Sequence, residues 1–552
     1  MRPIFVLLLI TAAGAHAQWQ TTPYTLKGGW NSMNLTGDAS YDSIENILPA
    51  EVEEVWRWNP NPTQVQFISS PLVPSAGTNE WSTWRRSGGD NTMTKLIGPG
   101  TFLVKCAGNI SDVYTVPIKQ SPQLPNNEWV RNGANFFGFP TLKTGSTYPA
   151  MSSYFATYPS AISANTKIYK YVGGDLGPGN PLQIFSPSQE QLDRTQGYWF
   201  STKVVGNFSA PVQISFSTRD GLGFGRTGST ITARILNRSA APLTLTFTPE
   251  DSETAPLSQP SITGPVPLTR RVFNAATLQF ESTPIAAPFN EILPPQASVT
   301  LTFGIDRTAM SSAADDAYFA SLLRVTDSGS LFDISVPATA SKPSLAGLWV
   351  GEARINAVDS MISGAGSTTT RAFPLRTLLH ISDSGAATLL SKAFLGQLAV
   401  EPNDVGVCVD ESLLKQDALE GAQRLVAAHL PLNRTISGSA PVAPPGAVAF
   451  TVITPFNDAS NPFVHQYHPD HDNKDARFQP AGAGVESYDI TRTCTFEFTT
   501  AAPEGSTVTS GWGATVIGGE YRETISGVHK NDIQVSGTFE LRRASEIGVL
   551  SQ

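Results

Sequence analysis

The sequence predicts a mainly β protein made of several domains, and three observations support this fold class. The chain has 552 residues, far more than the roughly 100–200 residues of one ordinary domain. Its 46 glycines and 41 prolines would interrupt long helices. Short segments in which apolar and polar residues alternate recur along the chain, and this period of two is typical of strands.

The composition and charge exclude several classes of protein. Hydrophobic residues make up 40% of the chain and charged residues 15%, so the chain is too apolar to be disordered. The formal net charge is −9 and no run of basic residues occurs, which argues against nucleic acid and anionic membrane surfaces as partners. No segment after residue 17 holds the roughly 18 consecutive apolar residues of a membrane span.

Residues 1–17 are typical of a signal peptide. Arg2 precedes an unbroken apolar run over residues 5–10, and Ala15 and Ala17 form an A-x-A cleavage site. We therefore expect cleavage near Ala17 and a mature protein that is secreted or held at the cell surface.

Residues 18–216 contain an internal repeat, with one Trp-rich copy over 18–120 and a second copy over 121–216. Two copies are too few for a solenoid, so we expect two similar β modules or one pseudo-symmetric domain. The matched segments are 28–31 with 132–135, 56–58 with 168–171, and 100–104 with 197–200.

Residues 217–229 are rich in glycine and are predicted to form a linker. They contain a G-x-G-x-x-G pattern from Gly223 to Gly228. A dinucleotide site needs a helix directly after this pattern, whereas a strand-like segment begins at Thr230. We therefore expect no dinucleotide site.

Residues 230–342 are predicted to form an antiparallel β-sandwich, because segments 243–247, 299–303 and 334–336 alternate with a period of two. Two stretches, 236–244 and 293–301, resemble the strand–turn–strand units of bacterial immunoglobulin-like modules. This resemblance implies an immunoglobulin-like sandwich and no particular function.

Residues 343–552 are predicted to form a barrel-like domain with one inserted amphipathic helix over 410–430. Gly347 and Trp349 open the first strand, and an Arg-bearing strand closes the region. These two features resemble lipocalin-like barrels, which implies a ligand cavity inside the barrel. The region as a whole is longer than a lipocalin and resembles a C-terminal module, of no named family, in large exported bacterial proteins.

Residues 461–475 hold the candidate metal site. Neutral histidine and carboxylate are ligands that Zn prefers, and paired aspartates suit Ca. Two interpretations of this segment remain open: it binds one divalent metal, Zn or Ca, or it is a polar loop without a metal. If a metal activated water here, Glu486 or Asp489 would be the base. The candidate ligands are His465, His468, Asp470, His471, Asp472 and Asp475.

The sequence contains no complete catalytic motif. Ser412 and Lys415 match S-x-x-K, but the companion motifs S-D-N and K-T-G are absent. We therefore assign no catalytic residue.

Four tryptophans of the first repeat are candidates for ligand binding: Trp56, Trp58, Trp81 and Trp84. Exposed aromatic rings can hold flat ligands such as sugars. Packing in the core of the module is the alternative, above all for Trp56 and Trp58.

Three cysteines and five N-x-[ST] sequons suit an exported protein. We expect a disulfide between Cys408 and Cys494, and a buried free thiol at Cys106. If the source glycosylates, the sequons predict surface loops. They lie at Asn34, Asn109, Asn207, Asn237 and Asn433.

These features together favour an exported, non-catalytic surface or extracellular binding protein whose partner is an extracellular macromolecule or a glycan. A metal-dependent extracellular hydrolase that uses the 465–475 loop is the first alternative. A lipocalin-like carrier is the second.

Overall fold

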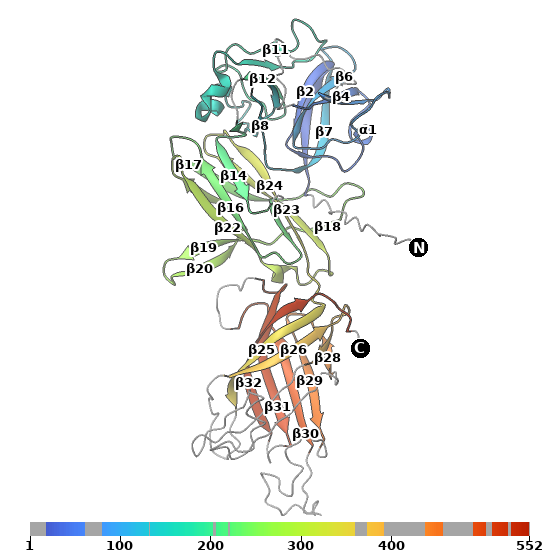
Figure 1. Cartoon of the computed structure of the whole chain (residues 1–552), viewed down its shortest axis with the longest axis vertical. Helices are drawn as coiled ribbons and strands as arrows, with labels where there is room; N and C mark the ends of the chain where they lie inside the picture. The colour runs from blue at the N-terminus through green and yellow to red at the C-terminus, as the bar shows by residue number, and fades with distance from the viewer. Residues whose placement is uncertain are drawn as a thin grey trace, which may run out of the picture. The chain divides into compact units, whose positions relative to one another are not determined.

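A computed structural model describes the chain over ten ranges and is almost entirely β. The described ranges are 18–60, 80–131, 133–202, 206–218, 221–358, 373–390, 436–455, 489–503, 511–527 and 532–550. The chain divides into two compact units (Figure 1). Unit 1 comprises Met1–Val272, Thr283–Asp306 and Ala317–Ser341, and unit 2 comprises Phe273–Ser282, Arg307–Asp316 and Lys342–Gln552. No helix in the described ranges is both long and apolar enough to span a membrane.

The first copy of the repeat forms two small sheets and one helical turn. One sheet has the order β2-β6-β4-β5 and the other has the order β1-β7-β3. The elements are β1 (Gln20–Lys27), β2 (Gly29–Leu35), β3 (Gly37–Asp38), α1 (Ile44–Ile47), β4 (Val52–Trp58), β5 (Trp81–Arg85), β6 (Gly100–Cys106) and β7 (Val113–Pro122).

The second copy repeats this topology, which confirms the predicted duplication. Its sheet β9-β12-β10-β11 corresponds strand for strand to β2-β6-β4-β5, and the pair β8-β13 corresponds to β1-β7. The elements are β8 (Glu128–Trp129), β9 (Gly133–Phe137), α2 (Met151–Tyr154), η1 (Phe155–Thr157), η2 (Pro159–Ile162), β10 (Lys167–Lys170), β11 (Leu182–Gln183), β12 (Tyr198–Thr202) and β13 (Gly206–Asn207).

A repeated asparagine explains why the Gly-x-Asn pattern recurs. In the first copy, Asn31 Oδ1 accepts the amide of Lys27 at 2.9 Å, and its Nδ2 donates to the Lys27 carbonyl at 2.6 Å. In the second copy, Asn135 makes the same two bonds with Val130, at 2.7 and 3.1 Å. Each asparagine therefore closes the turn that leads into its strand, β2 or β9.

The pairing registers correct the predicted alignment of the copies in one strand. Leu103 lies opposite Trp56 in the first copy, and Trp199 lies opposite Tyr169 in the second. Trp199 is therefore the counterpart of Leu103. The alignment of Gly100 with Gly197 is wrong by one residue, and in a strand such a shift exchanges the two faces of the sheet.

Residues 212–341 form a sandwich of two sheets, as the alternating segments predict. The sheet orders are β14-β16-β22-β19-β20 and β15-β24-β23-β17-β21, with β18 paired to β23. The strands are β14 (Val212–Phe216), β15 (Leu222–Gly225), β16 (Thr230–Asn237), β17 (Leu243–Asp251), β18 (Ile262–Gly264), β19 (Leu268–Asn274), β20 (Gln279–Pro284), β21 (Phe289–Leu293), β22 (Ser298–Ile305), β23 (Tyr318–Asp327) and β24 (Asp333–Ser341).

The predicted linker at 217–229 is wrong in part, because β15 lies within it and pairs in parallel with β24. Leu222 and Phe224 are buried in the sandwich. Gly221 has a φ of +66°, and a Cβ there would lie 2.9 Å from Pro337. This glycine therefore permits a close approach of two chain segments rather than a flexible connection.

Unit 2 contains a nearly closed barrel of eight antiparallel strands (Figure 1). Consecutive strands pair from β25 to β28 and from β29 to β32, and the first strand, β25, pairs with the last, β32, as predicted. A short segment, η3 (Arg307–Met310), also belongs to this unit. The strands are β25 (Gly347–Val358), β26 (Phe373–Ile381), β27 (Ala386–Leu389), β28 (Ile436–Pro441), β29 (Gly446–Thr454), β30 (Ile490–Phe498), β31 (Val516–Ser526) and β32 (Ile533–Ser545). The helix predicted over 410–430 lies outside the described residues.

The tryptophan of the opening strand contacts an arginine of the closing strand in unit 2. Trp349 on β25 is fully buried, and the Arg543 guanidinium of β32 lies 5.4 Å from its ring centre. Arg543 also donates to the carbonyls of Ser344, at 2.7 Å, and Ala346. This contact joins the first and last strands at one end of the barrel.

Candidate ligand-binding site

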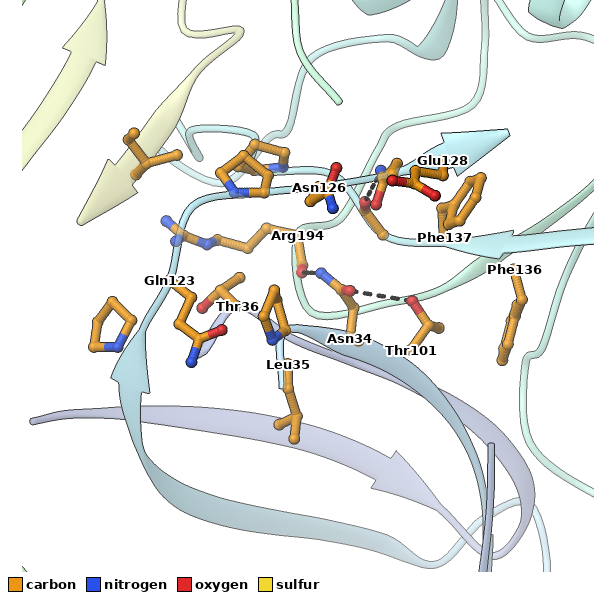
Figure 2. A pocket seen from close by; sticks show the side chains of 18 of the residues that line it. Asn34, Leu35, Thr36, Thr101, Gln123, Asn126, Glu128, Phe136, Phe137 and Arg194 are labelled. Carbon is orange, nitrogen blue, oxygen red and sulfur yellow. Dashed lines mark hydrogen bonds between the residues drawn. The ribbon is translucent and has the colours of Figure 1, made fainter. Parts of the chain in front are cut away.

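A pocket of about 330 Å³ lies in unit 1, where both copies of the repeat meet strand β24 (Figure 2). Its volume is at the lower end of the range of small-molecule sites, roughly 300–1,000 Å³. We call it the repeat pocket. Its principal lining residues are Asn34, Leu35, Thr36, Arg57, Trp58, Thr101, Gln123, Asn126, Asn127, Glu128, Phe136, Phe137, Arg194, Asp333, Ile334 and Ser335.

Asn34 joins the two copies in the wall of the pocket. Its Nδ2 donates to the Arg194 carbonyl at 2.9 Å, and its Oδ1 accepts the Thr101 hydroxyl at 3.2 Å (Figure 2). Gly138 makes room for this side chain, because a Cβ there would lie 1.9 Å from Asn34. A buried amide with both ends bonded holds the two copies in one geometry.

An ion cluster holds Arg194 beside β24. Its Nη1 lies 2.5 Å from Asp333 Oδ2, and Asp333 is only 3% exposed. Arg324 binds the same carboxylate through two nitrogens, at 2.9 and 3.0 Å. The hydrogen bonds that Arg324 donates to Asp333 raise the pKa of Arg324 above its ordinary value. The bidentate pair anchors the carboxylate, which in turn positions Arg194 at the pocket.

The opening of the pocket carries polar groups of several kinds. Gln123 and Glu128 are exposed. In Figure 2, Glu128 lies beside Phe137 at the right of the view, and Gln123 lies at the left. Arg57 is half-buried and donates to the Ile97 carbonyl at 3.1 Å, and burial lowers its pKa from the ordinary value. Amide, carboxylate and guanidinium groups thus stand next to aromatic edges.

This arrangement suits ligand binding through hydrogen bonds and apolar contact. Ser335 donates its hydroxyl to Gln20 at 3.1 Å. The polar groups can accept and donate hydrogen bonds, and the aromatic edges offer apolar contact.

The four candidate tryptophans are all buried, which agrees with core packing, the alternative to an exposed platform. Trp58 also lines the repeat pocket, and a role of the four in ligand binding stays a prediction. Trp56, Trp58 and Trp81 are 2%, 5% and 3% exposed and belong to the aromatic core between the two copies. In that core the Trp58 and Trp199 ring centres are 5.4 Å apart. Trp84, 6% exposed, packs in the other core of the first copy. The duplication supplies the second sheet that covers this face.

The metal-site prediction is not tested by the structure. His465, His468, Asp470, His471, Asp472, Asp475 and the suggested base Glu486 lie outside the described residues. Asp489, the other suggested base, is exposed. Within the described ranges, no group of three or more His, Cys, Asp or Glu side chains could hold a metal ion.

The cysteines are partly described. Cys106 is a buried free thiol, as predicted. Cys494 is buried in the barrel, next to the Glu523 carboxylate and the Tyr521 hydroxyl. Its predicted partner, Cys408, lies outside the described residues, so the disulfide stays a prediction.

Of the three sequon asparagines whose side chains the structure describes, two are buried rather than at the surface. Asn34 is 7% exposed and bonded as described above, and Asn237 is fully buried, with its Nδ2 donating to the Ala241 carbonyl at 2.9 Å. Asn109 is exposed, and its Oδ1 accepts the Ser111 hydroxyl at 2.5 Å. The side chain of Asn207 and the whole of Asn433 lie outside the described part.

Trp58 is a predicted ligand-binding residue that lines the pocket, but the sequence did not point to the residues that tie the pocket walls together. Asn34, Arg194 and Asp333 come from three segments that are more than a hundred residues apart. The available signal was indirect: it was the duplication itself, which predicts a junction between the copies.

No family model matches the sequence, and no curated protein matches it. Among the solved structures similar to this chain is the crystal structure of the E. coli chaperone DraB. The two chains are 12% identical, with a TM-score of 0.15. The match covers 32% of this chain and 93% of the chaperone.

Proposed function

We propose that this chain is an exported, non-catalytic binding protein whose ligand is a glycan held in the repeat pocket. The observation that carries the proposal is the pocket itself, of about 330 Å³, which residues of both repeats line with amide, carboxylate and guanidinium groups. Export rests on the signal-like residues 1–17.

The chemistry of the lining favours a polyhydroxylated ligand. Sugar hydroxyls both donate and accept hydrogen bonds, so they pair with side chains such as Gln123, Glu128 and Arg57. The apolar faces of sugar rings pack on aromatic edges, which Phe136 and Phe137 offer here.

The pocket is also held in shape before a ligand arrives. The Asn34 bonds and the Asp333 ion cluster tie the walls together. A site that is already ordered loses less entropy when it binds, which favours recognition of a flexible saccharide.

The test is glycan binding by the mature chain and two double variants. Gln123→Ala/Glu128→Ala removes two exposed groups at the opening, and Gln189→Ala/Glu51→Ala removes the same residue types at exposed positions elsewhere in unit 1. We expect a glycan array to identify a ligand. Calorimetry should then show about tenfold weaker binding for the pocket variant, because each lost hydrogen bond contributes on the order of 1 kcal/mol.

The control variant should bind like the parent chain. A parent chain that binds no glycan, or a control that weakens binding as much as the pocket variant, would contradict the proposal.

A further inference from the structure

We propose that a second groove beside the repeat pocket selects acidic polysaccharides, in which carboxylate or sulfate groups are spaced along a sugar chain. This inference rests on the proposed function and assigns its ligand class. The groove has a volume of about 710 Å³ and lies between strand β1 and residues 143–196 of the second copy. We call it the β1 groove.

The β1 groove adjoins the repeat pocket. Gln20 and Arg194 line both cavities. One oligosaccharide that extends past these two residues would contact the pocket and the groove together.

The β1 groove is basic, although the chain as a whole is acidic. Its lining includes four basic side chains and one carboxylate, Asp193, in a chain whose formal net charge is −9. A basic patch on an acidic protein attracts an anionic ligand to that patch. The basic residues are Lys27, Lys143, Lys170 and Arg194.

Two of these cations are available to a ligand. Lys170 lies 2.7 Å from Glu190, and Arg194 lies 2.5 Å from Asp333. Lys27 and Lys143 are exposed and form no ion pair with any residue in the described part of the chain.

The Lys143 side of the β1 groove also has an aromatic surface. The Lys143 ammonium lies 5.6 Å from the centre of the Tyr148 ring. Burial and the neighbouring Asp193 raise the pKa of Tyr148 to about 12, so this phenol stays neutral and adds no negative charge.

The composition of the lining favours sugars over denser polyanions. The lysines come from separate segments, and threonines of β1, among them Thr22 and Thr25, also line the groove. Duplex DNA carries a charge every ~1.7 Å, and so dense a polyanion would be repelled by the net negative chain. A polysaccharide with one charge on each sugar matches scattered cations and neighbouring hydroxyls.

The experiment compares two acidic polymers with their neutral counterparts. The probes are polygalacturonate with its methyl ester, and a sulfated galactan with the desulfated polymer. Binding to the mature chain is measured by calorimetry at low and at physiological ionic strength. We expect at least one acidic polymer to bind about tenfold more tightly than its counterpart, and salt to reduce this difference because ions screen exposed charges.

A double variant assigns the effect to the groove. Lys27→Gln/Lys143→Gln should abolish the preference for the acidic polymer and leave binding of the neutral one unchanged. Lys95→Gln/Arg131→Gln removes the same charge from exposed sites of unit 1 outside the groove and should keep the preference. Thermal unfolding checks that both variants are folded.

Three results would overturn the inference. The first is equal binding of acidic and neutral polymers, which leaves the proposed function standing. The second is loss of the preference in the control variant. The third is equally tight, lysine-dependent binding of poly-glutamate, which would assign the groove to acidic peptides. Failure of the proposed function is recognised separately, because then no neutral or acidic glycan binds.

Discussion

At the residue scale, burial decides which side chains with reactive chemistry can act. Cys106 on β6 is 2% exposed. Burial, assisted by the negative charges of Glu53 and Glu51, raises the pKa of this thiol to about 12. The thiolate is the nucleophilic form of cysteine, so the native thiol has little reactivity at neutral pH.

We predict that Cys106 resists iodoacetamide in the native protein at a pH of about 8 and is labelled once the chain is unfolded. Mass spectrometry of the peptide that contains Cys106 measures this. Rapid labelling of the native protein would contradict the burial that the structure shows.

The same pKa shift gives a pH dependence with a definite sign. Between the unfolded-state value of 9.0 and about 12, the native thiol keeps a proton that the unfolded chain has lost. The contribution of the Cys106 thiol to the free energy of unfolding is therefore fully present below pH 9 and is lost as the pH rises toward 12. Between pH 9 and about 10.5 this thiol should lower the free energy of unfolding by about 2 kcal/mol. Cys106→Ala should lack this decrease, which urea unfolding at the two pH values measures.

At the scale of elements, two neighbouring strands of the barrel bury an ion pair. Arg492 on β30 and Glu523 on β31 are 1% and 2% exposed, and Arg492 Nε donates to the Glu523 carboxylate. Tyr521 donates to the other oxygen of Glu523 at 2.8 Å. Burial alone would lower the pKa of Arg492, but the charge of Glu523 raises it above the ordinary value.

We predict that Glu523→Ala lowers the free energy of unfolding by about 3–5 kcal/mol, because it leaves the Arg492 charge buried without its partner. The double variant Arg492→Met/Glu523→Leu should be about as stable as the parent chain or more so. Nη1 and Nη2 of Arg492 have no hydrogen-bond partner in the described structure. The ion pair therefore compensates only part of the cost of removing the Arg492 charge from water, and an apolar pair avoids this cost. Urea unfolding measures both.

An exposed pair on the same strand serves as the control. Arg522 and Glu520 are 2.9 Å apart, with side chains 66% and 49% exposed. Glu520→Ala should change the stability by less than about 1 kcal/mol, because water screens the pair. Equal effects of Glu520→Ala and Glu523→Ala would refute the role given to burial.

At the scale of the whole molecule, each compact unit has a core of its own. In unit 2 the apolar side chains of the barrel strands form one buried cluster that includes Trp349. In unit 1 the aromatic cluster between the two repeats includes Trp58. Separate cores predict that the units unfold in separate steps, so one free energy of unfolding does not describe the chain.

We predict two calorimetric transitions for the mature chain. Trp349→Ala should lower the free energy of unfolding of only one transition, by about 3–5 kcal/mol. Trp58→Ala should lower that of only the other by a similar amount, because each variant leaves a cavity in one core. A single transition that both variants shift equally would show that the units unfold together.

Local patterns in the sequence predict several elements of the fold. The period of two predicted strands such as β17 and β22, and the repeated Gly-x-Asn predicted the duplication. Trp349 and the closing Arg-bearing strand predicted the two strands that close the barrel. These signals depend on residues that are neighbours in the chain, so the local pattern carries them.

Packing between distant segments determines which side chains are buried and which residues meet in the pocket. Trp56 lies in a core because a second copy covers it, and β15 is a strand because β24 lies beside it. The repeat pocket joins Asn34, Arg194 and Asp333 across distant segments. Burial and contact between charges depend on packing over long sequence separations, and no local pattern of residues encodes them.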